Sequence, residues 1–166
     1  MTYILKTDLE QLRDPQLLDR QFRAYFDYLE TIRSSLSPTA YEFAAAAWHY
    51  DHEDHRCPHD GWVEKLEITE RATGPRDEVR SIDTNLRLLG AYHDGSLELG
   101  YIDVAEYSLA IVAHSPSDRP RIGHGDWLRD EITLTGGSLV RHEIEFSTEA
   151  SWVIICRDLT WNWRPR

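Results

Sequence analysis

Apolar residues recur with a helical spacing near the start of the chain. Asp14 followed by Pro15 indicates a helix start, because aspartate accepts hydrogen bonds from first-turn amides and proline suits the first helical position. From Leu17 to Ile32 the apolar positions repeat at intervals of three and four residues. This spacing predicts an amphipathic helix of about five turns that ends before Pro38.

The next segment, residues 37–48, permits two interpretations. Thr39 with Glu42 three positions later fits a capping box, and the run of alanines favours a second helix. The same small residues could instead pack tightly as a strand, although alanine is uncommon in strands. We prefer the helix, which makes residues 1–50 a helical segment.

From Gly61 onward, apolar residues alternate with polar ones, as in strands that bury one face. Residues 93–95 (His-Asp-Gly) and 136–137 (Gly-Gly) have the composition of hairpin turns. Between Leu97 and Ile111 the apolar face switches twice, which predicts bulges and a strongly curved sheet. Later strand-like runs cover residues 127–135, 139–146 and 152–163.

The order of these elements indicates the fold class. Helices followed by a succession of strands, without alternation of the two, are typical of an α+β fold. We expect an N-terminal helical segment packed on a curved, mainly antiparallel sheet of about six strands. No repeat or long linker divides the chain, so residues 1–166 are predicted to form a single domain. Its parts are a helical segment (1–50), a His-rich loop (51–60) and a sheet (61–166) that a Pro- and Gly-containing loop interrupts at 115–126.

The charge balance narrows the class of partner. The 166 residues include 18 lysines and arginines against 29 aspartates and glutamates, for a formal net charge of −11. This excludes a nucleic-acid binder that relies on a net basic surface, and it favours encounter with a basic partner protein. The alternative is that the charge serves only solubility.

The sequence also predicts the location. No apolar run approaches the roughly 18 residues of a membrane-spanning helix. Lys6, Asp8 and Glu10 interrupt the region where a secretory signal needs an apolar stretch. Cys57 and Cys156 do not make a disulfide framework. We therefore expect a cytoplasmic protein with no membrane contact.

The densest chemical feature lies between Trp48 and Trp62. Imidazole, thiolate and carboxylate groups bind zinc and related divalent metals. The candidate metal ligands are His49, His52, His55, Cys57 and His59. Glu53 or Asp60 would be the base if the site were a metal-dependent hydrolase. However, the spacing matches no established ligand motif, and Pro58 breaks any helix that would align the histidines. The alternative is a polar connector whose histidines form local hydrogen bonds.

A second candidate site involves His142, which shares a predicted strand face with Val140 and Ile144. A histidine on this apolar face either finds a hydrogen-bond partner on another strand or faces a cavity. A satisfied core histidine is the preferred interpretation. The alternative is a small-molecule site on a concave sheet. Its candidate ligand-binding residues are His142, Tyr92, Tyr101 and Tyr107.

Aromatic residues mark the C-terminal strand as well. Trp161 and Trp163 fall on one strand face and precede two arginines. Tryptophan and arginine are the residues that interface centres use most, whereas a pair of tryptophans can equally cover the core. Both residues are therefore interface candidates, and both interpretations stay open.

No catalytic motif in the sequence indicates an enzyme class. The sequence has no nucleophile elbow, no P-loop and no G-x-G-x-x-G motif. We expect a non-enzymatic acidic protein that binds a basic partner protein, similar in composition to small acidic domains that neutralise or inhibit toxins. One alternative is a divalent-metal-binding protein or metal-dependent hydrolase centred on residues 49–60. The other is a small-molecule binder on the concave sheet face.

Overall fold

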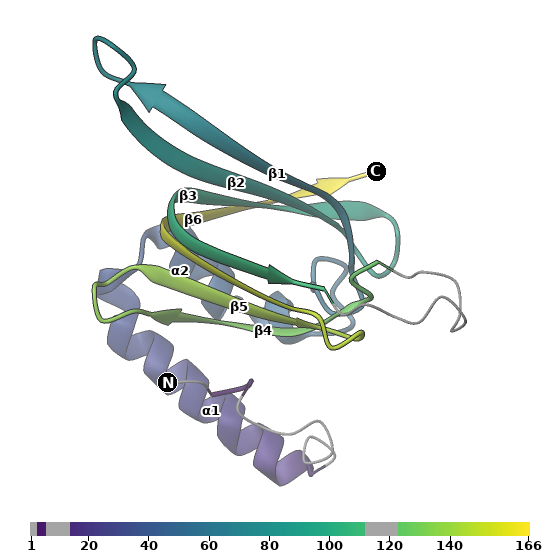
Figure 1. Ribbon diagram of the computed structural model, residues 1–166. Helices are drawn as coiled ribbons and strands as arrows, with labels where there is room; N and C mark the ends of the chain where they lie inside the picture. Colours follow the sequence, from purple (N-terminus) through teal and green to yellow (C-terminus); the bar gives the residue numbers. More distant parts are fainter. Residues whose placement is uncertain (1–2, 6–13, 112–122) are drawn as a thin grey trace.

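A computed structural model describes residues 3–5, 14–111 and 123–166 (Figure 1). Most of the loop predicted at 115–126 lies outside these residues. The described chain combines an N-terminal helical part with an antiparallel six-stranded sheet, which confirms the α+β fold. No helix among the described residues is both long enough and apolar enough to cross a membrane.

Helix α1 (Pro15–Ile32) begins as the sequence predicts. The Asp14 carboxylate accepts hydrogen bonds from the backbone N–H groups of Gln16 (2.9 Å) and Leu17 (3.3 Å). A short 3-10 turn, η2 (Arg33–Ser35), closes this part of the chain. The buried face of α1 contains Tyr25 and Leu29, so the apolar spacing correctly identified the side that packs on the protein.

Helix α2 (Pro38–Ala45) confirms the helical interpretation of residues 37–48, but the predicted cap was wrong. Ser37, not Thr39, is the N-cap, because its hydroxyl oxygen accepts a hydrogen bond from the backbone N–H of Ala40 at 3.1 Å. The Thr39 hydroxyl instead donates to the carbonyl of Leu159 at 3.2 Å. The 3-10 turn η3 (Ala47–Tyr50) follows and carries His49.

The strands form one open sheet in the order β1-β2-β3-β6-β5-β4, and all neighbours pair antiparallel. Their bounds are β1 (Trp62–Thr73), β2 (Val79–Leu89), β3 (Gly95–Ala110), β4 (Trp127–Leu134), β5 (Val140–Phe146) and β6 (Ser151–Pro165). The predicted turns at 93–95 and 136–137 connect β2 to β3 and β4 to β5. The apolar run from Trp152 to Cys156 lies in β6, in the interior of the sheet between β3 and β5.

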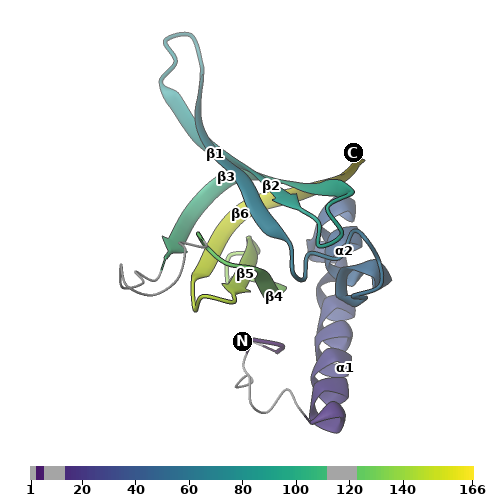
Figure 2. The ribbon, with the colours of Figure 1, turned by 90° about the vertical axis from the view of Figure 1, so that its right-hand side faces the viewer.

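The sheet divides where β2 and β3 separate. Strand β2 pairs with β3 only as far as Thr84 and Tyr101, whereas its pairing with β1 continues to Val79. The outer part of β1 and β2 therefore projects as a two-stranded ribbon, and β3 bends away with β6 (Figures 1 and 2). One register shift, beside Asp103 with its positive φ of 49°, accompanies the bend. The sequence had predicted two.

The helices cover one face of the sheet, and α1 runs along its β4 edge (Figure 2). The Tyr25 hydroxyl donates to the carbonyl of Ile132 (3.2 Å) and accepts from its N–H (2.8 Å). The Tyr28 hydroxyl accepts from the N–H of Leu134 at 2.9 Å. These bonds occupy backbone groups that an edge strand would otherwise expose. The apolar core lies between this face and the helices.

Candidate functional site

The His-rich segment separates into a buried part and an exposed part. His49, on η3, is 1% exposed and lies in the core beneath β4 and β5. His52 and His55 are exposed, and His59 is partly buried. Four of the five candidate metal ligands, His49, His52, Cys57 and His59, nevertheless line one small pocket of about 60 Å³, which His55 does not line. His49 also belongs to a second cluster.

That cluster is a buried hydrogen-bond network centred on Asp130 of β4. Nε2 of His49 lies 3.0 Å from both carboxylate oxygens of Asp130, and Nε2 of His142 lies 2.9 Å from Oδ2. The indole N–H of Trp127 donates to Oδ1 at 2.9 Å. Asp130 is 1% exposed, so three nitrogen donors replace the water that its carboxylate loses on folding.

The partners of the two histidines define where the hydrogens lie. Nδ1 of His49 is 2.8 Å from the carbonyl of Phe43, which can only accept, so Nδ1 carries a hydrogen. With Asp130 ionised, Nε2 of His49 must donate as well, and His49 is then an imidazolium. Nε2 of His142 also faces Asp130, and its Nδ1 forms a hydrogen bond of 2.9 Å with the Tyr101 hydroxyl, in which either atom can be the donor. The network thus contains a buried histidine–carboxylate ion pair.

Electrostatics agree with an ionised Asp130. Burial alone would raise the pKa of this carboxyl, because desolvation disfavours the charged form. The charge of His49, the hydrogen bonds from His142 and His49, and the charge of His142 outweigh burial and hold the pKa of Asp130 well below its ordinary value. Such a carboxylate is held in place and neutralised by its neighbours, which fits a structural ion pair.

The structure brings together two of the four candidate ligand-binding residues. Tyr101 and His142 are hydrogen-bonded and both are 0% exposed. Tyr92 lies on the turn between β2 and β3 and is 51% exposed, and Tyr107 lies on the far part of β3 and is 44% exposed. His142 does share its buried face with Val140 and Ile144, as strand alternation predicts. The small-molecule site on these four residues stays a prediction.

Among the exposed histidines, His52 and His59 stack on each other. Their ring centroids are 4.1 Å apart, and the ring planes are within 5° of parallel. A metal bound by imidazole lies in the plane of each ring, and two stacked parallel planes do not meet. In this arrangement the two rings therefore cannot share an ion. Within residues 3–5, 14–111 and 123–166, no group of three or more His, Cys, Asp or Glu side chains is arranged to hold a metal.

Cys57, the only thiol among the candidate metal ligands, is buried within the His-rich loop. Its Sγ donates to the carbonyl of His49 at 3.1 Å, and 4% of the residue is exposed. Desolvation raises the pKa of the Cys57 thiol to about 12, so the group stays protonated near neutral pH. A protonated thiol is a poor nucleophile.

His55 pairs with groups on the neighbouring turn. Its Nδ1 lies 2.5 Å from the Asp94 carboxylate, and its ring stacks on Tyr92 with centroids 4.1 Å apart. The hydroxyl of Tyr92 donates to the carbonyl of His52 at 3.1 Å. These contacts fix the His-rich loop against the turn between β2 and β3.

A groove of about 600 Å³ lies on the helical side. We call it the tryptophan groove. It is lined by Tyr41, Glu42, Ala45, Ala46, Ala47, Trp48, Asp51, Asp54, Arg56 and Trp161. The groove therefore combines α2, η3, the His-rich loop and β6, and it includes one of the two interface candidates, Trp161.

Two indole rings form the aromatic part of the tryptophan groove. The rings of Trp48 and Trp161 lie 4.8 Å apart at an angle of 46°. The guanidinium of Arg56 lies over the Trp48 ring, 5.3 Å from its centroid. Arg56 also bonds both carboxylate oxygens of Asp54, at 2.9 and 2.7 Å. This is a cation–π contact combined with a bidentate ion pair.

Two further carboxylates in the tryptophan groove lack a cationic neighbour. Glu42 and Asp51 are both exposed, and neither forms an ion pair with any residue that the structure describes. One oxygen of Asp51 accepts the backbone N–H of Glu53 at 3.0 Å. The lining thus holds three carboxylates against one guanidinium, which leaves an excess of two negative charges.

The other interface candidate, Trp163, has a packing role. Its half-buried ring lies over Gly90 and Gly95 at the two ends of the turn between β2 and β3. A Cβ atom at either glycine would collide with the indole. This placement matches the interpretation of a lid on the core for Trp163, whereas Trp161 borders the tryptophan groove.

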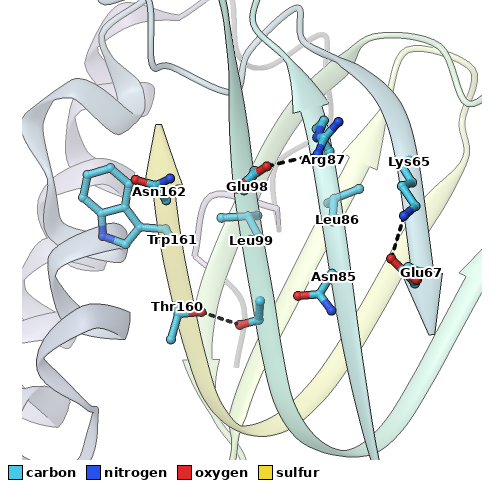
Figure 3. A pocket seen from close by; sticks show the side chains of 11 residues that line it. Lys65, Glu67, Asn85, Leu86, Arg87, Glu98, Leu99, Thr160, Trp161 and Asn162 are labelled. Atoms are coloured by element: carbon cyan, nitrogen blue, oxygen red, sulfur yellow. Dashed lines mark hydrogen bonds and ion pairs between the residues drawn. The ribbon is translucent and has the colours of Figure 1, made fainter. Parts of the chain in front are cut away.

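A second groove, of about 310 Å³, crosses the opposite face of the sheet over Gly100 (Figure 3). Its charged residues neutralise one another. Lys65 bonds Glu67 at 2.6 Å, and Arg87 bonds Glu98 at 3.3 Å, as Figure 3 shows. This groove consequently offers less uncompensated charge to a ligand than the tryptophan groove does.

Sequence reasoning did not identify several residues of these sites. Asp130 and Trp127 were treated as ordinary strand positions, and Trp48, Glu42 and Arg56 were not grouped with Trp161. The one available signal was a run of adjacent acids, Asp130 and Glu131, within a strand whose apolar residues suggested burial. Comparisons of the chain with protein-family models, with curated proteins and with solved structures gave no match.

Proposed function

We propose that this chain is a non-enzymatic binding protein that holds a basic partner protein at the tryptophan groove. The observation that carries the proposal is the pair of carboxylates, Glu42 and Asp51, which lie beside the Trp48 and Trp161 rings and form no ion pair within the described part of the chain. A basic side chain of a partner would supply the missing charge and cover the part of the Trp161 ring that remains accessible.

The charge of the whole chain supports the same partner class. At −11, its field draws cationic surfaces toward the protein and speeds their encounter. Most described arginines, in contrast, already face an acid of their own chain, as the Arg87 and Glu98 pair does. The chain therefore has more acid than basic charge to offer a partner.

The chemistry of the lining favours binding over catalysis. None of the described residues that line the tryptophan groove is a serine, cysteine or histidine. The His49 and Asp130 pair, which resembles an acid–base pair in composition, is buried and fully bonded within the core. Aromatic and carboxylate groups instead provide what a cationic protein surface requires.

Photo-crosslinking in extracts of the source cells tests the proposal. Benzoylphenylalanine replaces Ala47, exposed at the tryptophan groove, and in a matched protein it replaces Ala24, exposed on α1. We expect a basic protein to crosslink from position 47 and not from position 24. Mass spectrometry identifies the crosslinked protein, and the sequence of that protein gives its isoelectric point.

A charge-matched pair of variants completes the test. Glu42→Gln with Asp51→Asn should abolish the crosslink, whereas Asp27→Asn with Glu106→Gln, the same loss of charge elsewhere, should preserve it. No product, an acidic product, or equal loss in both double variants would overturn the proposal.

A further inference from the structure

The tryptophan groove already holds one guanidinium, that of Arg56. Its position over Trp48 and its two bonds to Asp54 show which cation geometry this surface accommodates. A planar guanidinium stacks on an indole and matches the two oxygens of a carboxylate at the same time. Arg56 is thus an internal example of a bound arginine side chain.

The rest of the groove repeats the same chemistry without an occupant from the described chain. Trp161 is half-buried and lies beside Trp48, and among the described residues no cation pairs with Glu42 or Asp51. Only one oxygen of Asp51 is engaged, by the N–H of Glu53. The Trp161 indole and two carboxylates that form no ion pair within the described chain therefore lie in the same groove as Arg56.

We infer that the tryptophan groove selects arginine over lysine side chains of its basic partner. This inference rests on the proposed function and adds the chemical identity of the recognised group. An ammonium ion has the charge that Glu42 and Asp51 require, but it is compact, strongly hydrated and cannot stack. A guanidinium is weakly hydrated and planar, so it gains from Trp161 as well as from the carboxylates.

Two synthetic peptides of equal length and charge provide the probe. Nona-arginine and nona-lysine are titrated into the full chain at low salt, and binding is measured by isothermal titration calorimetry. Electrostatic attraction is the same for both peptides. We expect nona-arginine to bind at least about fivefold more tightly because of its stacking on the indole.

Variants separate stacking from charge. Trp161→Leu should reduce the arginine-to-lysine affinity ratio to about one, and Trp161→Phe should keep part of it. Trp62→Leu is the matched control, because Trp62 is an exposed tryptophan (48%) that does not line the tryptophan groove. Circular dichroism checks that each variant is folded. If Trp161→Leu does not fold, the arginine-to-lysine affinity ratio of the wild type still tests the inference.

Glu42→Gln with Asp51→Asn should weaken both peptides by a similar factor and leave their ratio unchanged. Equal binding of both peptides by the wild type, with loss in this double variant, would overturn the selection of arginine and leave the proposed function intact. Binding of neither peptide, or binding that the double variant does not weaken, would remove the tryptophan groove as a basic site and the inference with it.

Discussion

His49 and His55 lie close together in the sequence, yet they are in opposite physical environments. His49 is buried and bonded to Asp130, a residue 81 positions away, through a carboxylate shared with His142. His55 pairs with Asp94 at the surface, where about half of each side chain is exposed. Both are histidine–carboxylate pairs at hydrogen-bond distance.

The difference teaches that distance alone does not determine how much such a pair contributes to the stability of the fold. In the core, neither partner can return to water if the other is removed, so each depends on the other. At the surface, water and salt replace a lost partner at little cost. The buried network should therefore determine stability, and the exposed histidines should contribute little to it.

The largest expected effect is that of Asp130→Ala. The charge of His49 would remain buried without its counterion, and the donors on His142 and Trp127 would lose their acceptor. We expect the free energy of unfolding to fall by about 3–5 kcal/mol in urea denaturation. Asp51→Ala, at an exposed carboxylate, should change it by less than about 0.5 kcal/mol. Equal losses in the two variants would break the comparison.

At acidic pH, the free energy of unfolding of the wild type should approach that of Asp130→Ala. Because the folded-state pKa of Asp130 lies below its unfolded value of about 3.9, its contribution is complete above that pH. The contribution is lost as the pH falls below about 4 toward the folded-state pKa. Glu131, whose pKa burial raises, titrates in both proteins and cancels in the difference. Urea denaturation at several pH values measures the difference in unfolding free energy between the two proteins. A difference that stays constant down to a pH of about 2 would contradict an ionised, stabilising Asp130.

Tyr101→Phe tests the outer end of the buried network. Removal of the hydroxyl leaves Nδ1 of His142 without its hydrogen-bond partner in a site closed to water. A loss of about 1–3 kcal/mol is expected in the free energy of unfolding. Tyr92→Phe provides the exposed counterpart, since the Tyr92 hydroxyl also donates one hydrogen bond. If Tyr92→Phe cost as much as Tyr101→Phe, burial would not be the deciding factor.

At the surface, His55→Ala should cost at most about 0.5 kcal/mol of unfolding free energy. The residue loses its contact with Asp94 and its stacking on Tyr92, but water reaches all three groups. Comparing thermal unfolding at low salt and in about 1 M salt separates charge from stacking, because salt screens only the former. A cost that matches the one at Asp130 would show that this loop is stabilising after all.

The smallest expected effect is that of zinc. Since the stacked rings of His52 and His59 cannot share an ion, added zinc should stabilise the wild type no more than a His52→Ala/His59→Ala variant. Thermal unfolding with and without zinc measures this. A stoichiometric stabilisation found in the wild type alone would support the metal interpretation of the His-rich segment.

Local signals in the sequence were sufficient for the helices and turns. The Asp14 cap, the turn at 93–95 and the buried face of His142 all depend on neighbours within a few positions, and each was predicted. The cap of α2 was misplaced because Ser37 and Thr39 are both good caps, and Pro38, which suits the first helical position, favours Ser37 before it.

The sites could not be predicted in the same way, because their parts meet only through the sheet. Nothing near Asp130 in the sequence identifies His49 as its partner, and residues between 48 and 62 gave the appearance of one cluster. The tryptophan groove likewise depends on α2, η3 and β6 coming together. Alternation gave the face of Trp161 but not what lies opposite it.

The contact between Gly95 and Trp163 has a consequence for how this sequence can vary. The indole fills the space that any side chain at position 95 would need, so each residue restricts the other. A larger residue at 95 would be tolerated only with a smaller one at 163. Over evolutionary time the two positions are expected to change together, as a correlated pair in any collection of related sequences.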